Sequence, residues 1–119
     1  VFDNTWAGPL YFKPIEQGID IEIQAATKYV VGHSDAMLGL VACTEKTYQA
    51  VKNSARNQCI SAGPDTCYLG LRGLRTMALR MNAQYDSAME VANWLERQNI
   101  VEEVLYPPLK SSHSHEKKT

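Results

Sequence analysis

The 119-residue sequence has no long hydrophobic run and no excess of charge of one sign. No apolar stretch approaches the roughly 18–20 residues that cross a bilayer, so we expect no membrane partner. The net charge is −1 at pH 7, which offers no field to attract nucleic acid or an anionic surface. Aromatic residues do not alternate with a basic patch, which also argues against a nucleic-acid partner. The 45% hydrophobic and 21% charged residues are those of an ordinary globular domain.

Cysteine is scarce and unpaired in number, with only Cys43, Cys59 and Cys67. Their spacing matches no metal-binding motif, so we predict no metal site. We expect all three to be small buried hydrophobic residues of a reducing compartment, which predicts a cytoplasmic protein.

The most informative feature is a single lysine that follows a strand-like pattern. Isoleucines alternate with polar residues over 19–25, and Lys28 comes directly after Thr27 beyond that strand. Ligands of open α/β sheets bind just beyond the carboxyl ends of strands. A partly desolvated lysine there can form a Schiff base, which makes Lys28 the candidate catalytic residue. On spacing alone, a surface lysine that begins a loop is the favoured interpretation.

A second strand end carries an acid. The run Val1-Phe2 is apolar and ends on Asp3, which is typical of a short buried strand. Enzymes that use pyridoxal phosphate (PLP) need a lysine and an Asp or Arg partner for the pyridine nitrogen. Asp3 and Lys28 meet at one sheet edge if their strands are parallel neighbours, and a crossover of roughly a dozen residues suffices for that. An ordinary strand-end acid is the alternative.

The rest of the chain reads as alternating strands and helices. We predict a short helix near 13–17, a loop over 28–36, a strand over 38–43 buried on both faces, and a last strand over 101–106. Thr44 is the predicted N-cap of the helix that follows it. Apolar residues at helical spacing predict one long helix from about 65 to 97, bent near Gly70 or Gly73. Arg72 and Arg75 are expected to form interdomain or subunit salt bridges.

Several short motifs occur in a fixed order along the chain. They are Asp3-Asn4-Thr5-Trp6, Lys13-Pro14, Gly18-Ile19-Asp20, Ala26-Thr27-Lys28-Tyr29, Gly32-His33-Ser34-Asp35 and Leu71-Arg72-Gly73-Leu74-Arg75-Thr76. Together they resemble the PLP-dependent enzymes of cysteine and methionine metabolism, over residues 1 to about 109. Within that family the run Gln24-Ala25-Ala26-Thr27-Lys28 is similar to the enzymes that eliminate at Cβ, and Trp6 points the same way.

This resemblance implies a fold, a cofactor and roles for three residues. The fold would be α/β, part of the large domain of a fold type I (aspartate aminotransferase-like) PLP enzyme, with a mainly parallel sheet and a long interdomain helix. Lys28 would bind PLP covalently and act as the catalytic base, Asp3 would bind the pyridine nitrogen, and Thr27 the phosphate. Many relatives have serine where this chain has Ala25, which would weaken phosphate binding modestly.

The resemblance also implies a domain plan and a substrate. Residues 1–70 would be the C-terminal part of the PLP-binding domain, 71–109 a connecting helix and the start of the next domain, and 110–119 a polar tail of an interior fragment. The substrate would be cystathionine or another cysteine S-conjugate, and the whole enzyme a homo-oligomer. A γ-synthase or γ-lyase of the same family and a non-catalytic fragment remain the alternatives.

Overall fold

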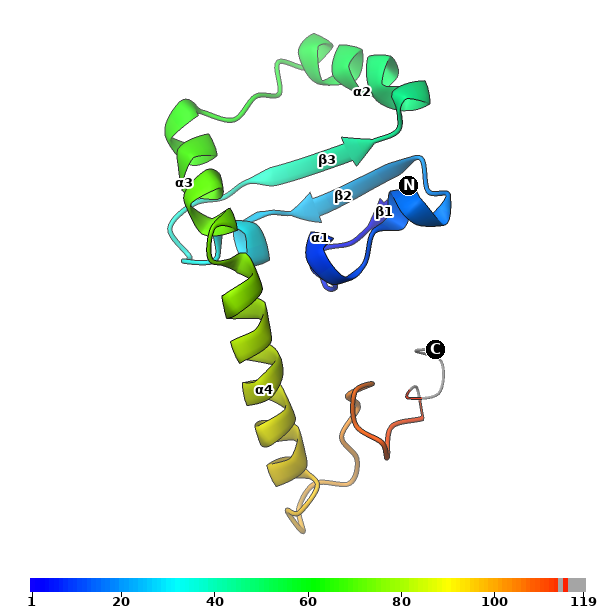
Figure 1. Cartoon of the computed structure of the whole chain (residues 1–119), viewed down its shortest axis with the longest axis vertical. Coiled ribbons are helices and arrows are strands. Elements are labelled where there is room, and N and C mark those ends of the chain that lie inside the picture. Colours follow the sequence, from blue (N-terminus) through cyan, green and yellow to red (C-terminus); the bar gives the residue numbers. More distant parts are fainter. Residues whose placement is uncertain (114, 116–119) are drawn as a thin grey trace. The chain divides into compact units, whose positions relative to one another are not determined.

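The computed structural model describes residues 1–113 and 115, and the chain divides into two compact units, Val1–Arg80 and Met81–Thr119. The first unit contains the three strands of the fold, β1 (Phe2–Asp3), β2 (Ile21–Ala25) and β3 (Gly39–Cys43). It also contains α1 (Gly8–Tyr11), the 3-10 helix η1 (Pro14–Gln17), the π-helical turn η2 (Thr27–Val31), α2 (Glu45–Asn57) and α3 (Pro64–Leu74). Helix α4 (Met77–Leu95) follows (Figure 1).

The sheet has the order β1-β2-β3 and places β2 in the centre. β1 pairs with β2 in parallel, with Phe2 opposite Glu22 and Asp3 opposite Ile23. β3 pairs with β2 antiparallel, with Gly39 opposite Ala25. The sheet is therefore mixed, and the prediction of a mainly parallel sheet is wrong for this part of the fold.

The reason for the antiparallel pairing lies in the segment that joins β2 to β3. The backbone N–H of Thr27 donates to the carbonyl of Leu38 at 3.0 Å, and the N–H of Leu38 donates to the Thr27 hydroxyl at 2.9 Å. These bonds close the segment into a loop whose two ends lie at the same end of the sheet. The chain therefore re-enters the sheet in the opposite direction instead of crossing over to a parallel strand.

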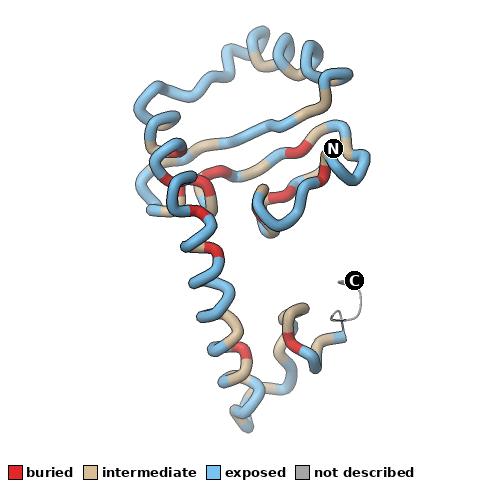
Figure 2. Tube along the Cα trace, viewed as in Figure 1, coloured by how far each residue is buried: buried red, intermediate tan, exposed pale blue. Residues whose placement is uncertain are grey.

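β3 is more exposed than its apolar sequence predicts. Leu40 is 43% exposed and Val41 is 53% exposed, so the prediction of a strand buried on both faces is wrong here. β3 is an edge strand of the sheet, and within residues 1–113 and 115 it pairs only with β2. Figure 2 shows the contrast, since η2 and the residue before it contain buried positions while no residue of β3 is buried.

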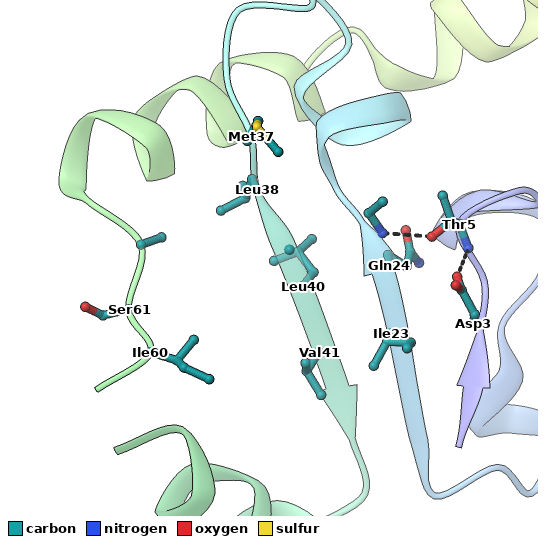
Figure 3. A pocket seen from close by; sticks show the side chains of 13 residues that line it. Asp3, Thr5, Ile23, Gln24, Met37, Leu38, Leu40, Val41, Ile60 and Ser61 are labelled. Carbon is teal, nitrogen blue, oxygen red and sulfur yellow. Dashed lines mark hydrogen bonds between the residues drawn. The ribbon is translucent and has the colours of Figure 1, made fainter. Parts of the chain in front are cut away.

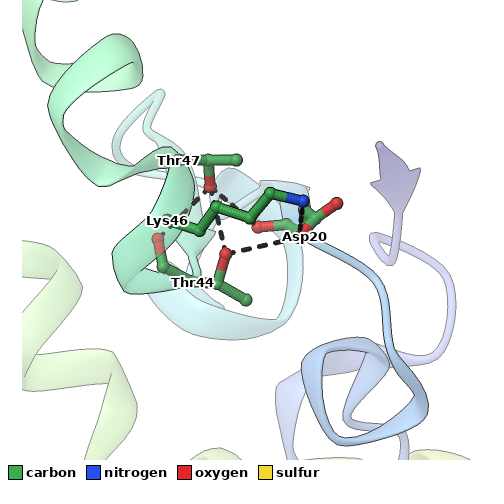
Figure 4. A network of polar contacts seen from close by, with 4 residues as sticks. All are labelled: Asp20, Thr44, Lys46 and Thr47. Atoms are coloured by element: carbon green, nitrogen blue, oxygen red, sulfur yellow. Dashed lines mark hydrogen bonds and ion pairs between the residues drawn. The ribbon is translucent and has the colours of Figure 1, made fainter.

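The start of α2 is fixed to the residue that precedes β2 (Figure 4). The carbonyl of Asp20 accepts the N–H of Thr44 at 3.0 Å and the hydroxyl of Thr47 at 3.2 Å. The Lys46 ammonium lies 3.9 Å from the Asp20 carboxylate. Thr44 occupies the predicted N-cap position, although its side chain makes no capping hydrogen bond. This network holds the entrance of β2 and the exit of β3 at one end of the sheet.

The predicted long helix over 65–97 is two helices, α3 and α4, separated by Arg75 and Thr76. The carbonyl of Gly73 accepts the N–H of Thr76 at 3.1 Å and the guanidinium of Arg80 at 2.8 Å. In a continuous α-helix the Gly73 carbonyl would instead accept the backbone N–H of the residue four positions later. The helical spacing predicted the helical residues correctly but did not reveal this interruption.

Three further predictions need correction. No strand forms over 101–106, where the N–H of Val101 donates to Gln98 and that of Tyr106 donates to Val104, both local turn bonds. The loop predicted over 28–36 begins with η2, which contains the fully buried Val30 and Val31. Cys59 and Cys67 are exposed and Cys43 is half-buried, because α2 and the start of α3 have little cover among the described residues.

The short helix predicted near 13–17 is confirmed as η1. In the second unit, Ala92 and Leu109 are buried, which gives this unit a small apolar contact of its own. The polar tail predicted over 110–119 lies partly outside the described residues. Within the described part of the chain, no helix is long and apolar enough to span a membrane.

Candidate functional site

The two predicted site residues lie at the ends of neighbouring parallel strands. Asp3 is the last residue of β1, and Lys28 lies in η2, three residues after the end of β2. Both line a hollow of about 410 Å³ together with Thr5, Trp6 and Tyr29. The parallel pairing that their meeting requires is therefore present, and an amine and a carboxylate share one concave surface.

Thr5 links the two strand ends (Figure 3). Its backbone N–H donates to Oδ1 of Asp3 at 2.9 Å, and its hydroxyl oxygen accepts the N–H of Ala25 at 2.8 Å. Ala25 is the last residue of β2, three positions before Lys28. Thr5 therefore contacts the carboxylate on one strand through its backbone N–H, and through its side chain it contacts the backbone that leads to the lysine on the other.

The same threonine acts on the charge of Asp3. Hydrogen bonds from the hydroxyl and the backbone N–H of Thr5 lower the pKa of the Asp3 carboxyl below its usual value, and the charge of Lys28 acts in the same direction. Hydrogen bonds to the ionised form favour that form. Asp3 is thus held as a carboxylate, which is the state that can accept a hydrogen bond from a protonated ring nitrogen.

A short polar residue next to Asp3 fixes the chain after β1. Asn4 is fully buried, and its amide nitrogen donates to the carbonyls of Gly8 at 3.1 Å and Phe12 at 2.9 Å and to the Glu22 carboxylate at 2.8 Å. Its backbone N–H donates to the carbonyl of Ile23 at 2.9 Å. These bonds hold the segment after Asp3 against β2.

Two buried valines and an arginine hold the turn that carries Lys28. Val30 and Val31 pack into the interior, and Arg80 donates to the carbonyl of Tyr29 at 2.8 Å. The same guanidinium nitrogen donates to Gly73, which joins the turn to the end of α3. Lys28 itself is exposed, so the partial burial that we expected at this lysine is not supplied by the described residues.

Thr27 does not line the hollow that contains Lys28 and Asp3. Its hydroxyl oxygen accepts the N–H of Leu38 at 2.9 Å and lies 3.4 Å from the Leu38 carbonyl. A hydroxyl has one hydrogen and two acceptor sites, and the 3.4 Å contact is a long bond. The Thr27 hydroxyl would have to exchange this long bond for one to a phosphate, and its predicted bond to a phosphate stays a prediction.

Sequence reasoning missed the role of Thr5 and the contacts that Arg80 makes to the turn of Lys28. The spacing of Asp3 and Thr5 is the one at which an aspartate side chain accepts the N–H two residues on, so this turn could have been expected. Arg80 lies 51 residues from Tyr29 in the sequence. No local pattern predicts a contact over that distance.

These residues fit part of a PLP site. An amine and an ionised carboxylate line one open hollow. The residues that line it include no arginine to hold a phosphate. The described residues thus do not enclose a site, and the roles of Lys28 and Asp3 toward PLP stay predictions.

The family of this chain follows from a family model and from a solved structure. The family model for Cys/Met metabolism PLP-dependent enzymes matches residues 1–119, and the chain belongs to this family. The crystal structure of cystathionine γ-synthase from Xanthomonas oryzae pv. oryzae superposes with a TM-score of 0.91 and 31% identity, over 96% of this chain and 30% of that one. The α/β fold of this part of a fold type I enzyme is thereby confirmed.

Curated relatives of similar identity catalyse different reactions. Cystathionine β-lyase from Escherichia coli K12 is 41% identical over 116 residues, which is 98% of this chain and 29% of the relative. L-alanine/L-glutamate racemase from Wolbachia pipientis wMel is also 41% identical over 116 residues, with the same coverage. The chain spans about 29% of the length of these relatives, and identity over this part does not by itself select one reaction.

Proposed function

We propose that the full-length protein is a PLP-dependent carbon–sulfur lyase that cleaves cystathionine by β-elimination. The observation that carries the proposal is the shared hollow of Asp3 and Lys28 at the ends of two parallel strands, in a chain of the PLP-dependent family. The run from Gln24 to Lys28, which resembles the β-eliminating branch, supports elimination at Cβ. Balanced overall, cystathionine and water would give homocysteine, pyruvate and ammonia.

Lys28 has two tasks in this proposal. Its amine would hold the cofactor covalently. The same amine would act as the general base that removes the Cα proton of the substrate. Its position in η2, a turn fixed by Val30, Val31 and Arg80, limits how far the backbone beneath the amine can move. A fixed base is the arrangement that favours proton transfer.

Asp3 and Thr27 would hold the cofactor. PLP, when bound, supplies an electron sink for the pair left on the substrate after proton removal. The Asp3 carboxylate, kept ionised by Thr5, would accept a hydrogen bond from the protonated ring nitrogen and so stabilise its charge. The Thr27 hydroxyl would donate its hydrogen to the phosphate in place of the Leu38 carbonyl. Further phosphate contacts would come from residues beyond this chain or from a second copy in a homo-oligomer.

Product analysis tests the reaction. The full-length protein is incubated with PLP and cystathionine, and the keto acids formed are identified by mass spectrometry. Pyruvate with homocysteine supports β-elimination, whereas the four-carbon keto acid with cysteine indicates γ-elimination. Release of neither acid, together with racemisation of alanine or glutamate, would overturn the proposal of a lyase.

The second candidate is a γ-synthase of the same family. The observation that favours it is the close superposition on the cystathionine γ-synthase of Xanthomonas oryzae pv. oryzae. A γ-synthase joins cysteine to an activated homoserine ester and produces cystathionine instead of consuming it. Formation of cystathionine from these two substrates, at a rate above its cleavage, would select this alternative.

A further inference from the structure

Thr5 bonds to both Asp3 and the end of β2. Its backbone N–H donates to Oδ1 of Asp3 at 2.9 Å, and its hydroxyl oxygen accepts the N–H of Ala25 at 2.8 Å, so the residue crosses the gap between β1 and β2. Thr5 also lines the hollow with Asp3 and Lys28, and it lines a neighbouring hollow of about 530 Å³ (Figure 3). It therefore lies at the surface that a ligand of this site would face.

We propose that Thr5 is a positioning residue, which orients the Asp3 carboxylate and fixes its spacing from the turn that carries Lys28. The proposal rests on the proposed function, because it assigns to Asp3 the role of ring-nitrogen partner. Thr5 acts only through Asp3 and Ala25, so it takes no proton from the substrate and forms no bond to it.

The hydroxyl of Thr5 ties the residue that bonds to Asp3 to the end of β2. Asp3 is exposed and β1 is only two residues long, so the strand itself gives the carboxylate little support. The Thr5 hydroxyl has one hydrogen, which it can donate to Asp3, while its oxygen accepts the N–H of Ala25. Both functions are lost in valine, which has the same shape, and both are kept in serine. The backbone N–H of Thr5 still contacts Asp3 in either variant.

The comparison of three variants in the full-length protein separates positioning from a structural role. Thr5→Val removes the hydroxyl, Thr5→Ser retains it, and Thr47→Val is the control, since it removes a threonine hydroxyl that bonds to Asp20 at the other end of β2. We expect Thr5→Val to lower kcat for keto-acid formation about tenfold, the value of one charge-assisted hydrogen bond, with a smaller change in KM. Thr5→Ser and Thr47→Val should stay within about threefold of the wild type.

A readout without cofactor makes the test independent of activity. In protein labelled with ¹³C-aspartate, the Asp3 carboxyl signal is assigned by its loss in Asp3→Asn and then titrated with acid. Its titration midpoint should rise in Thr5→Val and return in Thr5→Ser, because the ionised carboxylate has lost and regained a donor. Retained circular dichroism spectra and melting temperatures establish that all variants are folded.

Each outcome decides one point. An unchanged Asp3 midpoint in Thr5→Val, or a Thr5→Ser variant as impaired as Thr5→Val, overturns the positioning role. In the Asp3→Asn background, Thr5→Val should cause little further loss of kcat, and a full additional loss would also overturn it. If the wild type does not bind PLP through Lys28, the proposed function fails, while the titration of Asp3 still tests Thr5.

Discussion

Gly73 lies against Val30 so closely that a Cβ at position 73 would be 2.0 Å from the Val30 carbonyl oxygen. The neighbouring carbonyl of Val31 would be only 2.4 Å away. Both atoms belong to the backbone of η2, the turn that carries Lys28, and a backbone cannot move aside as the end of a flexible side chain can. The end of α3 and the lysine-bearing turn therefore form one rigid contact that depends on the absence of a side chain.

Gly73→Ala should accordingly destabilise the protein by about 3 kcal/mol, the upper end of the usual cost of overpacking. The matched control is Gly39→Ala, because a Cβ at Gly39 meets no atom within 4 Å. Denaturant unfolding of the full-length variants measures both. Equal unfolding midpoints for Gly73→Ala and Gly39→Ala would show that η2 does not pack on α3 as described.

Lys28 should be the residue that binds PLP covalently. We expect borohydride to fix the cofactor on Lys28 when the full-length protein is treated with PLP, because this lysine shares a hollow with Asp3. Peptide mass spectrometry after digestion locates the label. Lys13 and Lys46 serve as internal controls, since both are exposed lysines engaged in ion pairs outside that hollow. Label found mainly on either of them would remove the central claim of the site.

Asp3→Asn should reduce turnover far more than substrate binding. The amide cannot stabilise a positive ring nitrogen as a carboxylate does, so we expect kcat to fall on the order of a hundredfold with KM little changed. Steady-state kinetics of keto-acid formation provides both constants. The control is Asp20→Asn, which alters a carboxylate at the α2 network, remote from the hollow. An Asp3→Asn enzyme with normal turnover would assign the ring nitrogen to another residue.

The ion pair between Arg72 and Asp35 should give the fold an acid-sensitive contact. The hydrogen bond from Arg72, more than any other cause, lowers the pKa of Asp35 below its ordinary value near 3.8. A carboxyl with a lowered pKa stabilises the folded state above its ordinary value, and this contribution is lost as the pH falls through the folded-state pKa. Arg72→Gln should raise the Asp35 pKa toward 3.8 in an NMR titration. The exposed Arg75→Gln serves as the control and should leave that pKa unchanged.

The pair also corrects an expectation. Arg72 was expected to form a salt bridge between domains or subunits, yet its partner Asp35 lies in the same compact unit. The pair joins α3 to the bend after η2. Sequence spacing gave no sign of this partner, because the two residues are 37 positions apart.

The 119-residue chain alone should associate with itself and lack lyase activity. Large apolar side chains are exposed on α3 and α4, including Leu71 at 62% and Leu79 at 73%. Exposed apolar surface of this kind promotes association. Sedimentation velocity over a range of concentrations should show species larger than a monomer, and Leu71→Gln with Leu79→Gln should reduce them. Turnover of cystathionine by this chain within about tenfold of the full-length enzyme would refute the inactivity expected of an incomplete site.

Local sequence patterns predicted the elements that depend on neighbouring residues. They failed where contacts between residues distant in the sequence determine the structure. The alternation over 19–25 predicted β2, and Pro14 with Gly18 predicted η1. Both succeeded because neighbouring residues determine the pleat of a strand and the conformation of a turn. The antiparallel direction of β3 depends on the bonds between Thr27 and Leu38, and no period in the sequence encodes them. The segment over 101–106 was predicted to be a strand, but a strand also needs a partner.

The candidate site divides in the same way. Lys28 and Asp3 were identified from strand ends and from the family resemblance, and the structure brings them to one hollow. Their roles toward a cofactor stay predictions. Arg80 could not be found from the sequence, since its importance arises from a carbonyl at Tyr29 that only the folded chain brings near.

The central place of β2 has a consequence for how the sheet opens locally. Its backbone is bonded on both edges, to β1 and Asn4 on one side and to β3 on the other. Amides of such a strand exchange with deuterated water only when at least one neighbour detaches, whereas the outer edge of β3 exchanges freely. The strand that leads to Lys28 should therefore retain its protons longest in this unit. Local opening near the site would then begin at the short β1 and displace Asp3 before it displaces the lysine.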